Sequence, residues 1–404
     1  MRRLVLLALV LSLPSLALAQ FVRVEGSRFV RPDGSTLHIK GTNLGNWLVP
    51  EGYMWQLEDG VTASPREIET IVALLLGPDR SAAFWRDYRA RYITEADIRF
   101  LAATGLNTLR VPLHYKFFTT DDGEGFALLD RLAGWCRDAG LSLILGLHCA
   151  PGGQTGTNID DSLGYPWLFE SPSAQEQFLQ VWRRIAHHYR DEPVILGYDL
   201  LNEPLPHFKG WEHLQPKLDP LLRRALAEVR AVDPHHIVFF TGSHWGSDFS
   251  VLGAPPAPNL AYTFHKYWQP AKQSSIQPYL DFRTQHNVPL WLGESGENKD
   301  AWIAQFRTLL DQHDIGWTFW PYKKMGSAVG FVRFAPPVHW EKVQAFAARN
   351  RGTTDVEADQ SRRPTPAEIE ACFTDLLRQI EFAHCVANAG YLTALGLQVP
   401  PAGP

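Results

Sequence analysis

One stretch near the middle of the chain limits the folds that this sequence can adopt. Residues 194–201 read Val-Ile-Leu-Gly-Tyr-Asp-Leu-Leu, an almost continuous apolar run that is typical of a strand buried on both faces. The run ends in Asn202, Glu203 and Pro204, and the proline prevents the strand from continuing. Strands of this kind belong to parallel sheets covered by helices, so we expect an α/β protein in which a buried strand presents a carboxylate at its carboxyl end.

Strand and helix patterns alternate along the chain on both sides of this segment. The expected strands are residues 39–45, 107–113, 141–148, 194–201, 236–241, 260–265, 289–293 and 316–320. Helical patterns cover residues 95–103, 126–139, 173–189, 218–232 and 302–312, and the first two end at Gly105 and Gly140. Eight strands that alternate with helices predict a (β/α)8 barrel. An open Rossmann-type sheet is disfavoured because no G-x-G-x-x-G motif follows the first strand.

The two ends of the chain differ from this alternating region. Residues 1–19 combine two arginines, a short apolar core and a final Ala-Leu-Ala, the pattern of a cleaved secretory signal, so we expect a secreted or periplasmic protein. Residues 20–350 would form the catalytic barrel domain, opened by a small hairpin that turns at Pro32–Gly34. Residues 351–404 would form a polar linker and a C-terminal helical extension, helical over 367–397, that packs on the barrel.

Composition narrows the partners and the chemistry. The 404 residues carry 38 basic and 43 acidic side chains without a basic run, which argues against nucleic acid or a membrane as partner. Fourteen tryptophans are suited to stacking on sugar rings, although tryptophan is also a good core residue. The four cysteines have no metal-site spacing, and Cys372 with Cys385 is the pair we expect if a disulfide forms. We expect a monomer, a state that the sequence itself leaves open.

A second stretch repeats the pattern of the first. Residues 288–296, Val-Pro-Leu-Trp-Leu-Gly-Glu-Ser-Gly, present Glu294 after a buried strand. Other polar and aromatic residues also fall at predicted strand ends: Arg110, His148, Asn202, His244, Trp245, His265, Tyr267 and Trp320. In a (β/α)8 barrel the carboxyl ends of the strands line one shared cavity, so we expect these side chains to meet there.

Two facing carboxylates are what the hydrolysis of a glycosidic bond requires. One carboxylic acid protonates the leaving oxygen, and the second carboxylate acts on the anomeric carbon. The fourth and seventh strands lie on opposite sides of an eight-stranded ring, so Glu203 and Glu294 can face each other. A separation of about 5–5.5 Å would indicate double displacement with retention of configuration. A single glutamate at a strand end is more often a solvated residue, and the paired arrangement is what makes these two candidates. This chemistry requires neither a metal nor an organic cofactor.

The sequence resembles glycoside hydrolase family 5, a family of retaining barrel glycosidases, over roughly residues 35–345. The matching motifs are Leu109-Arg110-Val-Pro, Leu147-His148-Cys-Ala-Pro-Gly, Leu201-Asn202-Glu203-Pro, His265-Lys-Tyr267, Leu292-Gly-Glu294-Ser and Thr318-Phe-Trp320. Cys149 departs from the family's usual glycine at its position. The resemblance implies that Glu203 is the acid/base and that Glu294 is the nucleophile.

The resemblance also implies the roles of the surrounding side chains. Asn202 would bond the sugar's 2-hydroxyl, and Tyr267 and Arg110 would orient and charge-stabilise Glu294. His148 and His265 would contact the sugar and the acid. Trp320 would form the floor beneath the sugar ring.

The segment from Gly41 to Glu51 is similar to the first-strand motif of exo-β-1,3-glucanase-like members of the family, although Gly45-Asn46 replaces their Gly-Gly. In those enzymes a glutamate at the position of Glu51 binds a hydroxyl of the terminal glucose. The resemblance therefore implies a β-1,3- or β-1,4-glucan as substrate, and it leaves the linkage and the choice between exo- and endo-action open.

Three alternatives stay open at this stage. The same chemistry could act on a glycolipid, a mannan or another β-glycoside. A metal-dependent hydrolase could use His148, His244 and His265, although the first strand lacks the usual His-x-His pair. A non-catalytic carbohydrate-binding barrel would typically have lost one of the two carboxylates, and both are present.

Overall fold

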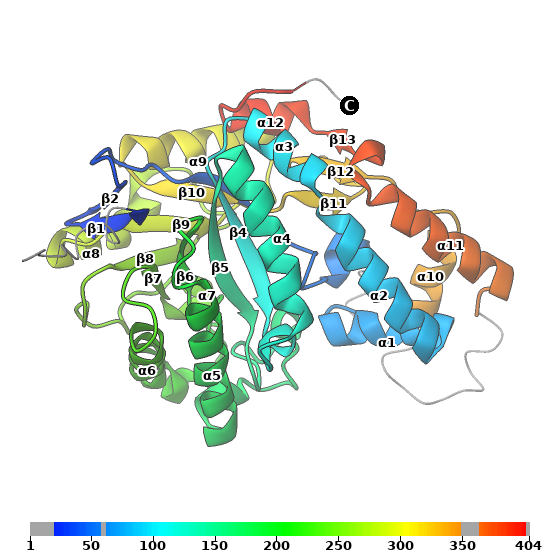
Figure 1. The fold of residues 1–404 in the computed structure, drawn as a ribbon, viewed down its shortest axis with the longest axis horizontal. Helices are drawn as coiled ribbons and strands as arrows, with labels where there is room; N and C mark the ends of the chain where they lie inside the picture. Colours follow the sequence, from blue (N-terminus) through cyan, green and yellow to red (C-terminus); the bar gives the residue numbers. More distant parts are fainter. Residues whose placement is uncertain (1–19, 58–61, 349–362, 401–404) are drawn as a thin grey trace, which may run out of the picture.

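Eight parallel strands close into a barrel, as the alternating pattern predicts (Figure 1). The structure is a computed structural model that describes residues 20–57, 62–348 and 363–400. The barrel strands are β3 (Lys40–Asn43), β4 (Thr108–His114), β5 (Ser142–Cys149), β6 (Ile195–Asp199), β7 (Ile237–Thr241), β8 (Leu260–His265), β9 (Leu290–Glu294) and β10 (Gly316–Phe319). They follow one another in chain order around the ring, and β10 pairs with β3 to close it. All eight predicted strands are confirmed within a few residues.

Helices surround the barrel and cover its outer face (Figure 1). The helices between and after the strands are α3 (Glu95–Ala103), α4 (Glu124–Ala139), α5 (Pro172–Tyr189), α6 (Leu218–Arg230), α7 (Ser243–Gly246), α8 (Gln277–His286), α9 (Asp300–Gln312) and α10 (Trp340–Ala347). Short 3-10 helices also lie in the connections, at η2 (Gly52–Trp55), η3 (Tyr115–Phe118), η4 (Asn158–Asp160), η5 (Trp167–Phe169), η6 (Glu212–Lys217) and η7 (Gln273–Ser275). The five predicted helices are confirmed, and Gly140 adopts the left-handed conformation expected of a C-cap glycine.

Two helices between the first two barrel strands were not predicted. They are α1 (Pro65–Leu76) and α2 (Pro78–Tyr92). A local signal marks the start of α1: Ser64 caps the helix, Glu67 returns the hydrogen bond, and Pro65 occupies the first turn. This capping box is the sequence signal that could have identified α1.

The N-terminal hairpin covers the amino end of the barrel. It consists of β1 (Arg23–Glu25) and β2 (Arg28–Val30), and their pairing places the hairpin turn at residues 26–27. The predicted turn at Pro32–Gly34 exists as a second reversal, which brings Thr36 back beside Val30. Apolar residues of this region pack on the first residues of the barrel strands in a separate small core: Phe29, Leu37, Ile39, Ile144, Leu196, Ile237, Phe239, Ala261 and Trp291. The hairpin thus seals one end of the barrel and leaves the carboxyl end open.

The C-terminal segment is less uniform than its sequence predicts. It contains α11 (Pro366–Gln379), η8 (Phe382–His384), β13 (Val386–Ala387) and α12 (Ala389–Ala394), so the expected helical extension is present as two helices with a short strand between them. The short strand β13 joins β11 (Lys323–Met325) and β12 (Val332–Phe334) in a separate three-stranded sheet. Asn388 interrupts the helical pattern because its backbone N–H and its side-chain amide donate to carbonyls of the β11–β12 region.

The extension packs on one flank of the molecule, where α11 lies against α1 and α2 (Figure 1). A buried ion pair lies beneath it: the Lys323 ammonium lies 2.6 Å from Asp97 and also donates to the backbone carbonyl of Ile380. A buried charge is costly without such partners, so this contact ties the extension to the barrel. The proposed signal segment and the domain boundary at residues 350–351 lie outside the described residues.

All four cysteines lie in the described part of the chain and are free thiols. The sequence left open whether Cys372 and Cys385 form a disulfide, and in the structure they do not. Cys372 is buried within α11, whereas Cys385 lies beyond η8 and directs its thiol toward backbone carbonyls at the end of α11. Among the described residues, no helix is both long enough and apolar enough to cross a membrane.

Candidate active site

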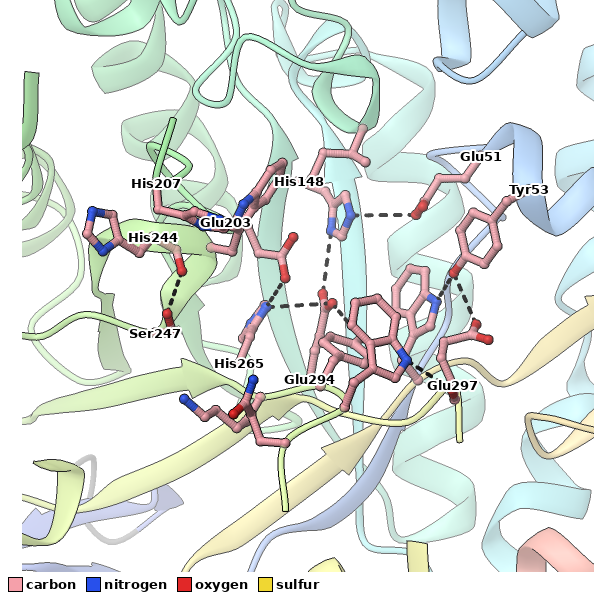
Figure 2. Close-up of a pocket in the computed structure, with 17 residues that line it drawn as sticks. Glu51, Tyr53, His148, Glu203, His207, His244, Ser247, His265, Glu294 and Glu297 are labelled. Atoms are coloured by element: carbon pink, nitrogen blue, oxygen red, sulfur yellow. Dashed lines mark hydrogen bonds and ion pairs between the residues drawn. The ribbon is translucent and has the colours of Figure 1, made fainter. Parts of the chain in front are cut away.

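The carboxyl ends of the barrel strands open into a cavity of about 670 Å³ (Figure 2). This size is typical of a small-molecule site. Most of the predicted residues line it, as do residues that were not predicted. The lining residues are Glu51, Tyr53, His148, Ile159, Glu203, His207, His244, Trp245, Ser247, His265, Lys266, Tyr267, Trp268, Gln269, Glu294, Glu297 and Trp320. The expectation that the residues at the strand ends share one cavity holds for all of those named except Arg110 and Asn202.

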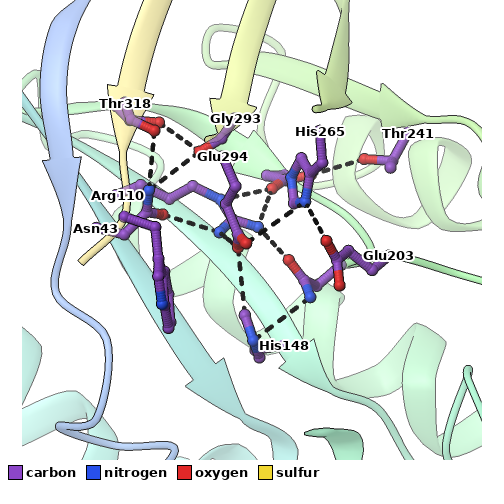
Figure 3. A network of polar contacts seen from close by, with 12 residues as sticks. Asn43, Arg110, His148, Glu203, Thr241, His265, Gly293, Glu294 and Thr318 are labelled. Atoms are coloured by element: carbon purple, nitrogen blue, oxygen red, sulfur yellow. Dashed lines mark hydrogen bonds and ion pairs between the residues drawn. The ribbon is translucent and has the colours of Figure 1, made fainter. Parts of the chain in front are cut away.

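Glu203 and Glu294 face each other in this cavity (Figure 3). Glu294 is the last residue of β9, and Glu203 follows β6 in a left-handed backbone conformation with φ 45°. One oxygen of each carboxylate and one ring nitrogen of His265 lie within 4.8 Å of one another. His265 Nδ1 lies 3.0 Å from Glu203 Oε1 and 3.6 Å from Glu294 Oε2, so the imidazole stands between the two carboxyl groups.

Arg110 lies in the middle of β4 and not at its end, so its predicted place in the strand is wrong. The side chain is fully buried, and its guanidinium lies 2.5 Å from Glu294, 2.7 Å from Asp199, 2.7 Å from Asn202 and 2.9 Å from Asn43 (Figure 3). Two carboxylates and two amide oxygens satisfy this buried cation. The contact with Glu294 was expected, and the structure shows how rigidly that carboxylate is held.

Asp199 and Asn43 were not singled out in the sequence. Asp199 is the only charged residue in the apolar run of β6, and this isolation is the signal that could have identified it. Asn43 ends β3, and its amide donates to the carbonyls of Gly293 and Thr318. Both residues hold Arg110 from below the cavity and act on Glu294 through it.

Glu294 also accepts a hydrogen bond from the Tyr267 hydroxyl, which donates to Oε2 over 3.0 Å. Glu294 therefore receives hydrogen bonds from a cation and a phenol. Glu203 has only the His265 ring within hydrogen-bond distance among the described residues. The two carboxyl groups thus occupy different environments, which is how enzymes divide acid and base roles between two carboxylates.

The different environments shift the pKa values of the two carboxyl groups and of the histidine between them. Burial raises the pKa of Glu203 to about 8, so this carboxyl carries a proton at neutral pH. Burial also raises the pKa of Glu294, but the charge of the Arg110 guanidinium and its hydrogen bond to the carboxylate oppose that shift. Burial lowers the pKa of His265 to about 4, so the imidazole between the carboxyl groups is neutral at pH 7. The site can therefore supply a proton from Glu203 and a hydrogen-bonded carboxylate at Glu294.

One end of the cavity is closed by a compact polar group. The ring of Trp320 stacks on that of His148, with centroids 5.6 Å apart. Glu51 is buried, and among the described residues its Oε1 has no hydrogen-bond partner, with His148 Nε2 3.6 Å away. Burial raises the pKa of Glu51 well above its usual range, and the nearby Glu294 adds to the shift. A buried polar atom without a partner beside a cavity indicates a place for a ligand hydroxyl.

Tyr53, Glu297 and Lys324 lie next to this group and were not predicted from the sequence; we call these three residues the wall. The Tyr53 hydroxyl accepts a hydrogen bond from the Trp320 indole and donates to Glu297 over 3.2 Å. Lys324 forms an ion pair with Glu297 at 3.0 Å, and its ammonium lies 4.4 Å from the centre of the Tyr53 ring. Glu297 follows β9 and Lys324 lies in β11, so contacts distant in sequence build the wall.

Asn202 does not line the cavity. Its side chain is fully buried, its oxygen accepts from Arg110, and its nitrogen lies 3.4 Å from His148 Nε2. The predicted contact of Asn202 with a sugar hydroxyl stays a prediction, as do the roles of the other site residues.

The three histidines of the metal-hydrolase alternative do not converge. His244 contacts Gln215 and Asp248 on the far side of the cavity from His148. Within the described residues, the group with ligand atoms close enough to hold a metal ion is Glu203, His265 and Glu294, which is the carboxylate pair itself. His148, His244 and His265 therefore do not form the metal site of that alternative.

A family model described as cellulase, glycosyl hydrolase family 5, matches residues 76–326 of the chain. The protein belongs to glycosyl hydrolase family 5. This family 5 glycosidase acts on glucans or related glycosides, and the family resemblance of the sequence motifs is confirmed.

Several curated proteins are similar to this glycosidase. A β-xylosidase of Phanerodontia chrysosporium is 29% identical over 349 residues, covering 76% of this chain and 71% of the relative. Endoglucanase C of Acetivibrio thermocellus is 23% identical over 335 residues, covering 66% and 94%. A probable glucan 1,3-beta-glucosidase A of Aspergillus niger is 28% identical over 208 residues, covering 50% and 49%. The relatives thus differ in the sugar and in the bond that their names describe.

Solved structures share the fold. An endogalactoceramidase superposes with a TM-score of 0.57 at 19% identity, over 76% of this chain and 75% of the other. A rutinosidase from Aspergillus niger has a TM-score of 0.57 at 21% identity, over 72% and 90%. At identities this low, the superpositions show only that these proteins share the barrel fold.

Proposed function

We propose that this family 5 glycosidase is a retaining, exo-acting β-glucanase that releases one glucose unit at a time. The observation that carries the exo-action is the position of His148. Its imidazole lies 3.9 Å from the Glu294 carboxylate on one side and 3.6 Å from Glu51 on the other. Glu51 and Glu294 are thus separated by about the width of one imidazole ring, so a single sugar bound beside His148 can contact both carboxyl groups.

The retaining mechanism rests on the spacing of the two carboxyl groups. One oxygen of Glu203 lies within 4.8 Å of one oxygen of Glu294, close to the roughly 5–5.5 Å of retaining enzymes and short of the roughly 6.5–9.5 Å that an inverting enzyme needs for its water. Glu294 attacks the anomeric carbon, and the bond to the leaving oxygen breaks as Glu203 transfers its proton to that oxygen. A water molecule then loses a proton to Glu203 and attacks the same carbon, which releases Glu294 and restores the β configuration.

The other proposed roles follow from the contacts. Arg110 and Tyr267 hold the nucleophile in position and stabilise its charge. Glu51 binds a hydroxyl at the far side of the glucose, with Trp320 under the ring. No partner beyond carbohydrate is needed for this reaction, and we retain export and a monomeric state as predictions from the sequence.

The identity of the sugar that is removed needs a direct test. Of the three relatives described above, the β-xylosidase has both the highest identity and the largest share of this chain covered. Matched 4-nitrophenyl β-glucoside and β-xyloside should be hydrolysed with a preference for the glucoside. A strong preference for the xyloside would transfer the proposal to that sugar while leaving the mechanism unchanged.

The deciding experiment is hydrolysis of laminari- and cello-oligosaccharides with products resolved by size and anomer. The proposal predicts glucose as the only early product, released first as the β-anomer. Mixed oligosaccharide products would contradict exo-action, and an initial α-anomer would contradict retention. Comparison of the two series assigns the linkage.

A further inference from the structure

A row of aromatic side chains leads away from the end of the cavity where Glu203 lies. We call it the aromatic track and define it as Trp245, Phe208, Trp211, Tyr165 and Trp167. Neighbouring rings lie 6.1, 5.3, 6.0 and 4.7 Å apart between centroids, in that order. The rings come from the loops after β5, β6 and β7, which are far apart in sequence. Trp245 lines the cavity, whereas Trp167 is 47% exposed, so the track runs from the cavity to the surface.

The track lies on the leaving-group side of the proposed reaction. Figure 2 shows Glu203, His207 and His244 on one side of Glu294, with Glu51, Tyr53 and Glu297 on the other. The chain that leaves Glu203 continues directly into the loop that carries Phe208 and Trp211. A group expelled with the proton of Glu203 would therefore depart toward the track.

Two rings of the track, Tyr165 and Trp211, have contacts that position them. The Tyr165 hydroxyl donates to Glu170 over 3.0 Å, and Lys217 holds the same carboxylate at 2.8 Å. Trp211 packs directly on Gly156, where a β-carbon would come within 2.3 Å of the indole. Ordered aromatic rings bind a ligand at little cost in side-chain entropy.

Exposure and neighbouring polar groups indicate the class of ligand. Phe208 is 42% exposed, and the edges of the track carry polar atoms from His207, His213 and the Tyr165 hydroxyl. A sugar presents C–H faces that pack on aromatic rings, while its hydroxyl groups stay in contact with water and with polar side chains. An alkyl group gains most from an enclosed apolar slot, which exposed rings with polar edges do not provide.

We propose that the aromatic track binds further sugar units of a β-glucan chain beyond the bond that is cleaved. This inference rests on the proposed function, since the direction of the chain follows from the roles of Glu203 and Glu294. The glycosidase would then take one glucose into the closed end and hold the rest of the chain along the track.

The test compares the double variant Trp167→Ala/Phe208→Ala with the wild type on laminari- and cello-oligosaccharides from the disaccharide to the hexasaccharide. For the hexasaccharides we expect KM to rise by about tenfold with kcat nearly unchanged, because exposed aromatic contacts are lost. Turnover of 4-nitrophenyl β-glucoside, which is too short to reach Trp167, should stay within about twofold. Leu74→Ala is the matched control, since Leu74 is also 42% exposed but lies on α1.

A binding measurement separates this proposal from the proposed function. Calorimetric titration of the hexasaccharides is carried out on Glu294→Gln, with and without the two track substitutions. Weaker binding caused by the track substitutions supports the track even if the wild type cleaves no glucan. Equal binding, together with unchanged KM values in the active enzyme, would overturn it while leaving the glycosidase assignment intact. If octyl β-glucoside loses affinity in the double variant and the oligosaccharides do not, the track binds apolar leaving groups and the stated ligand is wrong.

Discussion

The two ends of the cavity are built in different ways. The closed end consists of charged and hydrogen-bonded groups, with the Glu297–Lys324 ion pair and the Tyr53 hydroxyl behind Glu51 and Trp320. The open end consists of aromatic rings that reach the surface. A polar site rejects an analogue that leaves its buried groups unpaired, whereas an apolar surface discriminates weakly. Under the proposed function, we therefore expect an enzyme that is selective for the sugar it removes and tolerant of what that sugar is attached to.

The largest expected effect lies between the two ends, at the proposed nucleophile. Glu294→Gln should lower kcat/KM by a factor on the order of 10⁴ or more on every substrate, because no covalent intermediate forms. The amide can keep the contacts to Arg110 and Tyr267, so thermal unfolding should be little changed. Residual activity above about a hundredth of the wild type, measured on purified protein with an activated aryl glucoside, would assign the nucleophile elsewhere.

The second prediction divides substrates by their leaving group. Glu203→Ala should lower kcat/KM on laminaribiose by about 10²–10⁴-fold, because its sugar leaving group needs a proton. On 2,4-dinitrophenyl β-glucoside the loss should be less than about tenfold, since this leaving group departs as an anion. Equal losses on the two substrates would contradict the acid assignment and with it the position of the leaving-group end.

The pH dependence tests the same carboxyl group. Glu203 must be protonated to act as an acid, and burial raises its pKa to about 8 in the folded protein. Activity on laminaribiose should therefore fall as the pH rises through about 8, and activity on the dinitrophenyl glucoside should fall less. Because the folded state binds this proton more tightly than the unfolded chain, stability should also decrease from about pH 4.5 to about 8. Glu203→Gln should flatten that part of the stability profile in urea titrations.

At the closed end, we predict a loss of kcat/KM that is the same for every leaving group. Glu51→Gln should lower kcat/KM by about tenfold to a hundredfold on short, long and aryl substrates alike, because each places a glucose against this side chain. Glu341→Gln, at an exposed carboxylate on α10, serves as the control. A loss confined to long oligosaccharides would place Glu51 outside the sugar pocket and remove the contrast between the ends.

The smallest expected effect comes from a contact through which the C-terminal extension supports the closed end. The Tyr391 hydroxyl of α12 donates to the backbone carbonyl of Trp320 over 3.1 Å, although residue 391 lies beyond the family match, which ends at residue 326. Tyr391→Phe should cost about 1 kcal/mol of unfolding free energy and raise KM by a few fold on all substrates. Unchanged stability in urea titration would show that the extension does not support the sugar floor.

The sequence predicted those parts of the molecule that depend on local patterns. Apolar runs that end in polar residues located all eight strands, and the motif after each strand located Glu203 and Glu294. The same patterns misplaced Arg110, because an apolar context does not reveal how deep in a strand a buried cation lies. They also gave no sign of the Glu297–Lys324 wall or of the three-stranded sheet that β13 completes, since these depend on contacts between distant segments. The sequence also left open whether Cys372 and Cys385 are bonded, because proximity in sequence does not orient two thiols, and both are free in the structure.

The most direct test of the central claim is to trap the intermediate on the enzyme. Incubation with 2-deoxy-2-fluoro-β-glucosyl fluoride should release fluoride and leave the fluoroglucosyl group esterified to Glu294, because the 2-fluoro substituent slows hydrolysis of the intermediate. Mass spectrometry of the intact protein and of its peptides should show one such adduct, on the peptide that contains Glu294. An adduct on Glu203 would reverse the two roles, and turnover of glucosides through an intermediate that never accumulates on either carboxylate would contradict double displacement.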